Sequence, residues 1–144
     1  MIDQPLDDRF NLQRFLTAQD PVFETVRTEL REARKRTHWM WFIFPQINGL
    51  GRSPTSKYFA LSSKEEAQAY LSHPILGPRL MECTRLIAQI EGRTIGEILG
   101  SPDDLKFKSS MTLFAAATPD NRIFLAALEK YFAGENDEAT LSRL

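Results

Sequence analysis

The sequence predicts an all-α fold, a single compact domain of about seven or eight short helices in irregular, orthogonal packing. Three observations lead to this prediction. Apolar residues recur at spacings of three and four, helix caps and breakers divide the chain at short intervals, and no segment alternates as a half-buried strand does. Only residues 109–114, SSMTLF, resemble a strand. With 144 residues, of which 42% are hydrophobic, the chain can build one domain with its own core.

The first part of the chain predicts a loose leader at residues 1–10, followed by the helical domain at residues 11–144. Asn11 can cap a first helix that extends to Gln19. Asp20-Pro21 then combines a capping side chain with a proline at the first helical position, which predicts the start of a second helix. The apolar face of this helix comprises Val22, Phe23, Val26 and Leu30.

Residues 39–44, WMWFIF, are six consecutive apolar residues and cover every side of a helix. Such a segment is typical of a central buried element, and its expected core residues are Trp39, Met40, Ile43 and Phe44. Pro45 should end this helical turn, because a proline restricts the residue before it. Residues 46–57 contain two glycines and a proline, which predict a loop. For residues 57–61, a short helix and a turn are both compatible with the sequence.

The middle of the chain predicts a helix from Ser63 to Ser72, because Ser63 and Glu66 have the spacing of a capping box. His73-Pro74 and Gly77-Pro78 are predicted breakers. The following helix should end before Gly92. Its buried stripe consists of Leu76, Leu80, Cys83, Ile87 and Ile90.

Three further helices are expected towards the C-terminus. Thr94 and Glu97 form a second capping box, with Gly100 as the end of that helix. Ser101-Pro102 begins the next, whose core face is Phe107, Met111, Phe114 and Ala115. Its first turn holds two acidic residues, Asp103 and Asp104. Thr118-Pro119 begins the last long helix, Gly134 ends it, and residues 137–144 could add a final turn; the inward face is Phe124, Ala127, Leu128 and Tyr131.

Charge and composition exclude several classes of function. The net charge is −1, and residues 24–36 hold five basic and three acidic residues, so we do not expect nucleic-acid binding. The longest apolar run is six residues, whereas roughly 20 are needed to span a bilayer. We therefore expect a cytoplasmic protein without membrane contact. One cysteine, two histidines and no HExxH motif predict neither a metal site nor a cofactor.

The first candidate site follows the basic run at residues 34–36. If a helix continues unbroken from Arg31 to Phe44, one side of it presents Arg31, Arg34, Lys35, His38, Trp41 and Phe42. This surface suits a ligand with an anionic group, held by Arg34 or Lys35, and a planar ring stacked on Trp41. His38 would act as a catalytic acid or base or as a donor; a structural histidine bonded to a backbone carbonyl is the alternative.

Two further groups of residues could belong to the same site. The loop Gly49-Leu50-Gly51-Arg52-Ser53 can bring backbone N–H groups close to an oxyanion, but it lacks the full phosphate-loop pattern, which favours a plain surface turn. The second group is a polar cluster within a predicted helix, Lys106, Lys108, Ser109, Ser110 and Thr112. Its hydroxyls could bond the carbonyls four residues earlier, line a polar pocket, or belong to a partly solvated face.

We therefore expect a pocket lined by residues 34–53 and 106–114 that binds an anionic, ring-bearing metabolite such as a nucleotide. Gln46 and Ser110 would orient this ligand; Gln46 could instead satisfy the local backbone. A non-enzymatic protein-interaction module with an exposed apolar face is the alternative. The sequence does not decide between an enzyme and a binding protein, and it leaves the oligomeric state open.

The chain resembles a known family through several segments, of which HWMWFIFPQ is the most specific. The matching segments are NLQRF with AQ at 11–19, RKRTHWMWFIFPQINGLGRS at 34–53, SKYFALSSKEEAQAYLSHPILGPRL at 56–80, KFKSSMTLF at 106–114 and GENDEATLSRL at 134–144. They resemble the bacterial domain of unknown function numbered eighteen-ten, whose members are sometimes labelled calpastatin. The resemblance implies a small helical protein and brings no established activity. Since calpastatin is a disordered inhibitor and this chain has core stripes and caps, we expect no protease inhibition.

Overall fold

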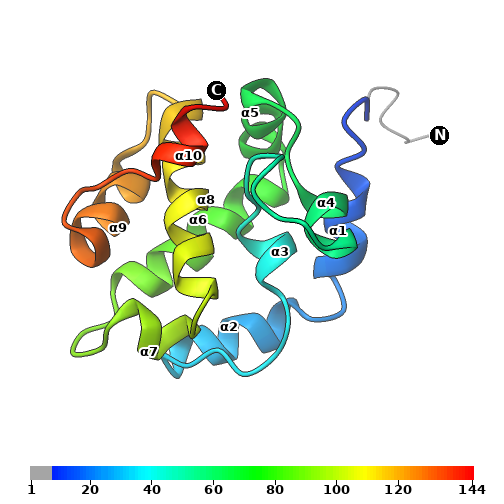
Figure 1. Ribbon diagram of the computed structural model, residues 1–144. Helices are drawn as coiled ribbons and strands as arrows, with labels where there is room; N and C mark the ends of the chain where they lie inside the picture. Colours follow the sequence, from blue (N-terminus) through cyan, green and yellow to red (C-terminus); the bar gives the residue numbers. More distant parts are fainter. Residues whose placement is uncertain (1–7) are drawn as a thin grey trace.

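The structure is a computed structural model that describes residues 8–144, and all of its regular elements there are helices (Figure 1). The ten helices are α1 (Gln13–Gln19), α2 (Phe23–Arg31), α3 (Met40–Ile43), α4 (Pro54–Phe59), α5 (Lys64–Ser72), α6 (Leu76–Ala88), α7 (Ile95–Leu99), α8 (Asp103–Ala117), α9 (Arg122–Phe132) and α10 (Glu138–Leu141). The predicted all-α single domain is confirmed. The number of helices exceeds the predicted seven or eight because α3 and α4 are separate short helices. Residues 1–7 of the expected leader lie outside the described residues.

Helix α8 is the centre of the molecule. It packs against α5, α7, α9 and α10, and Figure 1 shows it (yellow) running through the middle of the fold. Residues 109–115 are all buried, so the helix has no solvent-facing side over two turns. The segment that resembled a strand is therefore a helix whose surroundings are protein on every side. Phe107 stacks edge-on against Phe44, and Phe114 contacts Tyr70.

Helix α6 forms the second layer of the core, against α2, α5 and α9. The predicted stripe is confirmed for Leu76, Leu80, Cys83 and Ile87, which are at most 1% exposed, whereas Ile90 lies beyond the end of α6 and is only partly buried. Gly77-Pro78 does not break the helix as predicted but lies in its first turn, where the proline removes an N–H that has no partner within the helix. A Cβ on Gly77 would lie 2.2 Å from the carbonyl oxygen of Leu71, so a glycine permits α5 and α6 to meet at this corner.

The helix required by the first candidate site does not continue to residue 44. Helix α2 ends at Arg31, and α3 begins only at Met40. Ala33 has a positive φ of 61°. The buried Glu29 carboxylate accepts hydrogen bonds from the backbone N–H groups of Arg36 and Thr37. Because these donors point back to α2, residues 32–39 form a loop and the predicted common helical face is wrong.

Several predicted helix boundaries are confirmed by their hydrogen bonds. Thr94 and Glu97 form a complete capping box. Ser63 caps α5, but the Glu66 side chain bonds Ser62 rather than Ser63, so that box is only half formed. Asp103 and Asp104 lie in the first turn of α8 as expected, and the four expected core residues at 39, 40, 43 and 44 are at most 2% exposed.

Other boundaries differ from the prediction. Asp8, not Asn11, caps α1, because its carboxylate accepts from the backbone of Leu12 and Gln13. Asp20 does not start α2 but closes the last turn of α1, with its N–H donating to the Leu16 carbonyl. The predicted start at residues 118–119 is also early, since α9 begins at Arg122.

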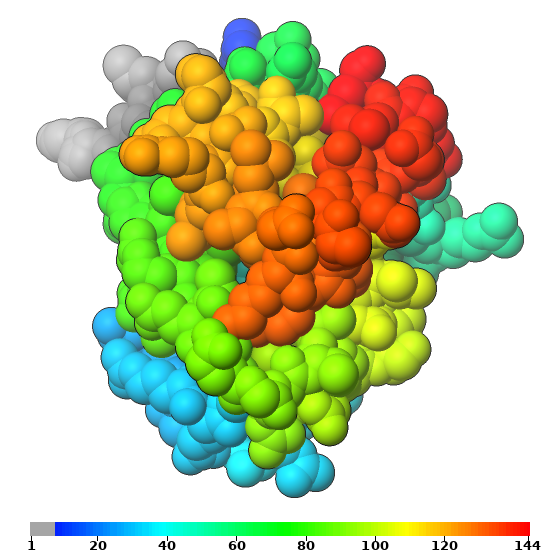
Figure 2. Space-filling model, turned by 90° about the vertical axis from the view of Figure 1, so that its left-hand side faces the viewer, coloured from blue at the N-terminus to red at the C-terminus, as the bar shows by residue number. Residues whose placement is uncertain are grey.

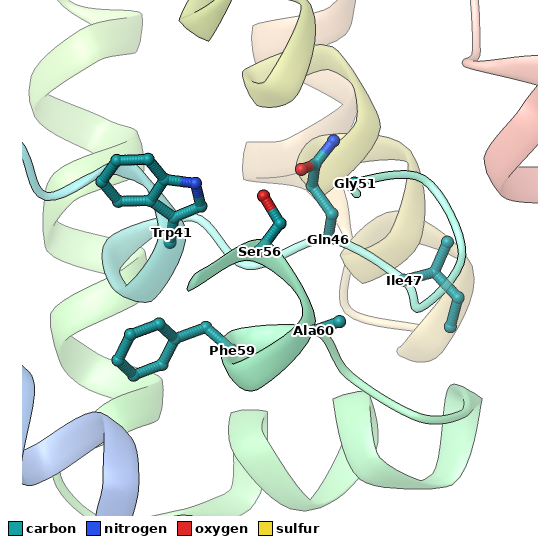
Figure 3. Close-up of a pocket in the computed structure, with 7 residues that line it drawn as sticks. All are labelled: Trp41, Gln46, Ile47, Gly51, Ser56, Phe59 and Ala60. Atoms are coloured by element: carbon teal, nitrogen blue, oxygen red, sulfur yellow. The ribbon is translucent and has the colours of Figure 1, made fainter. Parts of the chain in front are cut away.

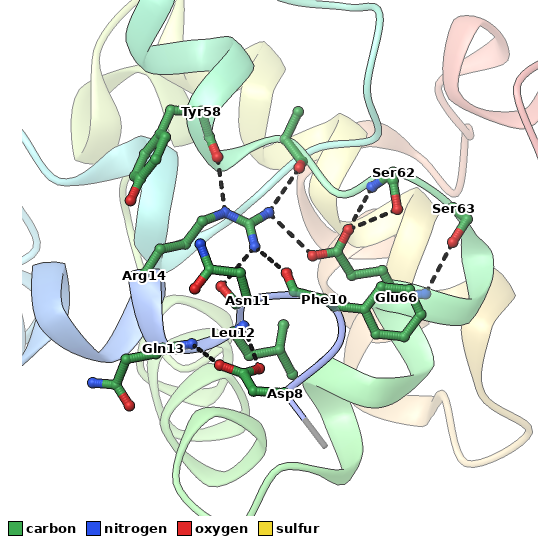
Figure 4. A network of polar contacts seen from close by, with 11 residues as sticks. Asp8, Phe10, Asn11, Leu12, Gln13, Arg14, Tyr58, Ser62, Ser63 and Glu66 are labelled. Atoms are coloured by element: carbon green, nitrogen blue, oxygen red, sulfur yellow. Dashed lines mark hydrogen bonds and ion pairs between the residues drawn. The ribbon is translucent and has the colours of Figure 1, made fainter. Parts of the chain in front are cut away.

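Arg14 fastens α1 to the segment between α4 and α5 (Figure 4). Its guanidinium donates to the carbonyl oxygens of Phe10, Asn11, Tyr58 and Ala60, and it pairs with Glu66 at 3.0 Å. The Arg14 and Glu66 side chains are only 8% and 3% exposed. This network fixes the end of α4, which forms one wall of the pocket described below.

None of the helices within residues 8–144 is both long enough and apolar enough to cross a membrane.

Candidate functional site

A small, partly open pocket lies between α3, the loop that follows it, and α4. We call it the Trp41 pocket; it is lined by Trp41, Gln46, Ile47, Gly51, Ser56, Phe59 and Ala60 (Figure 3). The empty space at the pocket and its mouth is about 230 Å³, but the centre of a water-sized sphere can move through only about 10 Å³. The pocket as it stands therefore has room for about one water molecule or one small functional group.

The indole nitrogen of Trp41 gives this pocket its chemical character. Trp41 Nε1 is buried and has no hydrogen-bond partner among residues 8–144. Figure 3 shows it on the side of the ring that faces Ser56 and Gln46. An indole nitrogen can only donate, and a buried donor without an acceptor costs about 1–3 kcal/mol. Trp41 thus presents an unused donor to the pocket, and an acceptor placed there would remove this cost.

The neighbouring Trp39 shows how the same group is satisfied elsewhere. Its Nε1 donates to the Glu29 carboxylate at 2.9 Å, within a side chain that is 1% exposed. Burial tends to raise the pKa of the Glu29 carboxyl, but hydrogen bonds from Arg36, Trp39 and Thr37 together lower it below its ordinary value. The two tryptophans therefore differ: one indole N–H has an ionised partner, and the other has none.

Two polar side chains face the pocket beside Trp41. The Ser53 and Ser56 hydroxyls are hydrogen-bonded at 2.9 Å, while Ser53 Oγ accepts from the Ser56 backbone and caps α4. Either hydroxyl can donate in this pair, and when Ser53 donates, the Ser56 hydroxyl hydrogen is available to a second acceptor. The Gln46 amide, which has both donors and an acceptor, projects into the same space (Figure 3).

Backbone contacts hold the pocket wall in place. Asn48 N–H donates to the Leu61 carbonyl, and Leu61 N–H donates to the Gln46 carbonyl, which makes a short parallel bridge between residues 47 and 61. A Cβ on Gly51 would lie 2.4 Å from the Cβ of Ser56. The absence of a side chain at Gly51 therefore lets the loop lie close to α4. A larger residue at position 51 would displace the loop from Ser56.

Two lysine ammonium groups lie near the pocket, each over the ring of one tryptophan. Asp103 pairs with Lys35 at 3.0 Å and, more loosely, with Lys106 at 3.5 Å. The Lys35 ammonium lies 5.2 Å from the Trp39 ring centre, and the Lys106 ammonium lies 5.0 Å from the Trp41 ring centre. Two ammonium groups share the Asp103 carboxylate, and one of them, that of Lys106, lies over the Trp41 ring.

The structure separates the residues expected to form the first site. Arg34, His38 and Arg52 are exposed. Lys35 is committed to Asp103, with a side chain that is 8% exposed. Trp41 and Gln46 do meet in one pocket, and Ser53 adjoins it through Ser56.

The second expected group, at residues 106–114, serves mainly to anchor α10. The Ser109 and Thr112 hydroxyls donate to the carbonyls four residues earlier, one of the alternatives left open by the sequence. The one Ser109 hydroxyl hydrogen is shared between the Leu105 carbonyl and Asp137, and Asp137 N–H donates to Thr112 Oγ1. Lys108 lies 3.5 Å from Glu135. Ser110 is completely buried, and its hydroxyl has no partner among the described residues.

Three polar residues that shape the site were not predicted: Ser56, Asp103 as the partner of Lys35, and Arg143, described below. Only the first had a usable signal. Ser53-Pro54 repeats the pattern of a capping residue followed by a first-turn proline, and it correctly marks the start of α4 three residues before the expected turn. The partners of Lys35 and of the glycine loop depend on tertiary contacts that no local pattern reveals.

Two wider and more open hollows lie elsewhere on the described surface, one beside Met81 and Ile123 and the other beside Arg14 and Tyr58. Within residues 8–144, no three histidine, cysteine or acidic side chains are grouped as metal ligands would be. The large apolar side chains that are exposed belong to different elements: Tyr58, Ile75, Leu105, Leu125, Leu141 and Leu144.

Comparison with known proteins identifies relatives without an assigned activity. A family model described as "Protein of unknown function (DUF1810)" matches residues 9–144, and no curated protein matches the chain. The chain is 58% identical to the conserved hypothetical protein Rv1873 from Mycobacterium tuberculosis, whose crystal structure superimposes with a TM-score of 0.94. The match covers 95% of this chain and 98% of that one. Neither description mentions calpastatin.

Proposed function

We propose that this chain, which belongs to the family described as "Protein of unknown function (DUF1810)", binds a small ligand that places an oxygen acceptor in the Trp41 pocket. One observation carries the proposal: the buried Trp41 indole N–H has no partner among residues 8–144, yet it borders a small, partly open pocket. Buried donors are normally paired, and exceptions are frequent at sites that hold a ligand or water.

The donors around the pocket favour an oxyanion. The Trp41 N–H, the Ser56 hydroxyl and the Gln46 amide can all donate to one oxygen group. The Lys106 ammonium over the Trp41 ring adds a positive charge nearby. Its ion pair with Asp103 is long, at 3.5 Å, so Lys106 can exchange this partner for the anionic group of a ligand. A carboxylate or a terminal phosphate group meets these requirements better than a cation or an apolar group.

The size of the pocket limits what can enter. With about 10 Å³ available to a water-sized centre, a whole nucleotide does not fit, whereas a single carboxylate oxygen or phosphoryl oxygen does. The remainder of an anionic, ring-bearing metabolite would lie outside, along the loop that carries Arg52. In this arrangement Lys106 replaces Lys35 and Arg34 as the cation, and exposed His38 could act only on a ligand that extends beyond the pocket.

The two indole groups provide an experiment with an internal reference. In a ¹⁵N–¹H spectrum, Trp39 and Trp41 each give one indole resonance, assigned with the variants Trp39→Phe and Trp41→Phe. Titration with acetate, inorganic phosphate and adenosine monophosphate should shift the Trp41 resonance saturably and leave that of Trp39 in place. If none of the three probes shifts Trp41 at millimolar concentrations, the pocket holds only water and the proposal fails.

A further inference from the structure

The C-terminal residues contact the loop that contributes Gly51 to the wall of the Trp41 pocket. Arg143 Nη2 donates to the carbonyl oxygen of Gly49 at 3.1 Å. A Cβ on Gly49 would lie only 2.7 Å from Arg143 Nε, and Gly49 has a φ of 101°. The guanidinium therefore packs directly on the loop backbone. Glycine is favoured at position 49 because the φ is positive and a Cβ would collide with Arg143. Figure 2 shows the last residues (red) beside the teal segment near residue 50.

The C-terminal segment is itself held firmly at its base. The Asp137 carboxylate accepts from the hydroxyls of Ser109 and Thr140 at 3.0 and 2.5 Å and from Thr140 N–H at 3.1 Å. Thr140 is completely buried, whereas residues 141–144 are exposed. Thus α10 is anchored to α8 at one end and extends Arg143 to the loop at the other.

The loop has fixed points on both sides of the contact. Asn48 is bonded to Leu61, and Ser53 caps α4. Between them, Gly51 lines the pocket against Ser56. Movement of residues 49–52 is the shortest way to open the pocket, because the other walls belong to helices or to the bridge between residues 47 and 61.

We infer that residues 137–144 act as a latch: Arg143 holds the glycine loop over the Trp41 pocket, and release of this contact opens the pocket to ligand. The latch regulates access and so rests on the proposed function for its purpose. Asp137 and Arg143 are positioning residues in this scheme, since neither lines the pocket. The Ser109 and Thr112 hydroxyls take part indirectly, by holding Asp137 on α8.

Hydrogen exchange of the Trp41 indole N–H tests the latch without any ligand. Loss of one exposed hydrogen bond in Arg143→Ala should speed this exchange about two- to tenfold. Asp137→Asn, which loosens the anchor but keeps Arg143, should act in the same direction. The Trp39 indole N–H is the reference within the molecule. Arg122→Ala is the matched control, because Arg122 is 94% exposed and makes only a 4.0 Å ion pair.

The outcomes separate the two proposals. Faster Trp41 exchange in both Arg143→Ala and Asp137→Asn, with Trp39 and the control unchanged, supports the latch. Exchange in Arg143→Ala equal to that of the control overturns it, as does an effect of Arg143→Ala that Asp137→Asn does not share. If acetate, phosphate and the nucleotide all fail to bind, the proposed function falls, while the exchange rates still decide whether the loop is latched.

Discussion

Replacement of Glu29 by alanine should destabilise the protein strongly, because one carboxylate organises the whole loop from α2 to α3. Glu29 is 4% exposed and accepts from Arg36 N–H at 2.8 Å, from the Thr37 N–H and hydroxyl at 3.2 and 2.8 Å, and from Trp39 Nε1 at 2.9 Å. Loss of this carboxylate leaves the Trp39 indole N–H without an acceptor. Because Trp39 is only 1% exposed, water does not replace the lost acceptor.

The size of the loss in unfolding free energy depends on which of the four donors remain buried when the carboxylate is removed. Arg36 and Thr37 are exposed and can recruit water, so their bonds are largely replaced. The Trp39 N–H cannot, and an orphaned buried donor together with the lost charge-assisted bond costs about 2–4 kcal/mol. Relief of the desolvation of the carboxylate offsets part of this cost. We expect a net loss of about 2–3 kcal/mol in the free energy of unfolding.

Urea denaturation followed by tryptophan fluorescence measures this loss, and a double-mutant cycle with Trp39→Phe isolates the pair. The coupling between Glu29 and Trp39 should be about 1–2 kcal/mol. A coupling indistinguishable from zero would refute the reasoning, because it would mean that the buried bond contributes nothing.

The pH dependence gives a second check on Glu29. Its folded pKa is lowered from the ordinary value of 4.5, so the folded state favours the ionised form. The stabilisation is fully present above the unfolded pKa and is lost as pH falls through the folded pKa. The difference in unfolding free energy between wild type and Glu29→Gln should therefore be constant near neutral pH and shrink below about pH 4.5. A difference that grows on acidification contradicts the assignment.

Three further predictions follow from local geometry. Burial raises the pKa of the Cys83 thiol to about 12, so Ellman's reagent should find no reactive thiol in the native protein and one after unfolding; rapid native labelling would contradict this. Thr94→Ala removes the capping box of α7 and should cost about 1 kcal/mol in urea denaturation, and no loss would argue against the cap. Gly77→Ala places a Cβ against the Leu71 carbonyl and should cost about 3 kcal/mol, whereas Gly96→Ala, with no neighbour closer than 3.7 Å, should be nearly neutral; equal effects would contradict the packing argument.

Much of the fold was predictable because it depends on local rules. The stripe through Leu80, Cys83 and Ile87 follows the helical repeat, and the Thr94–Glu97 box needs only four consecutive residues. The break between α2 and α3 was not predictable in the same way. The break depends on the Glu29 carboxylate in α2, which accepts hydrogen bonds from backbone N–H groups of the following loop. Helix propensities describe single residues and do not include such a contact between a side chain and a later backbone segment.

The candidate site was only partly predictable for the same reason. Trp41 and Gln46 lie close in sequence on either side of Pro45, and they do meet in the pocket. Lys35 was expected to hold a ligand, but a distant carboxylate, Asp103, pairs with it instead. Bonding of the Ser109 and Thr112 hydroxyls to their own helix was one of the alternatives that the sequence left open, but their shared partner Asp137 could be identified only from the tertiary structure.

The affinity of Trp41→Phe for the oxyanion that shifts the indole resonance tests the central claim most directly. Phenylalanine keeps an aromatic ring under the Lys106 ammonium and removes the N–H donor. Isothermal titration calorimetry should show binding weakened by about tenfold or more relative to wild type, since a hydrogen bond to a charged acceptor is lost. Equal affinity in the two proteins would show that the ligand does not use this donor, and the Trp41 pocket would not be its binding site.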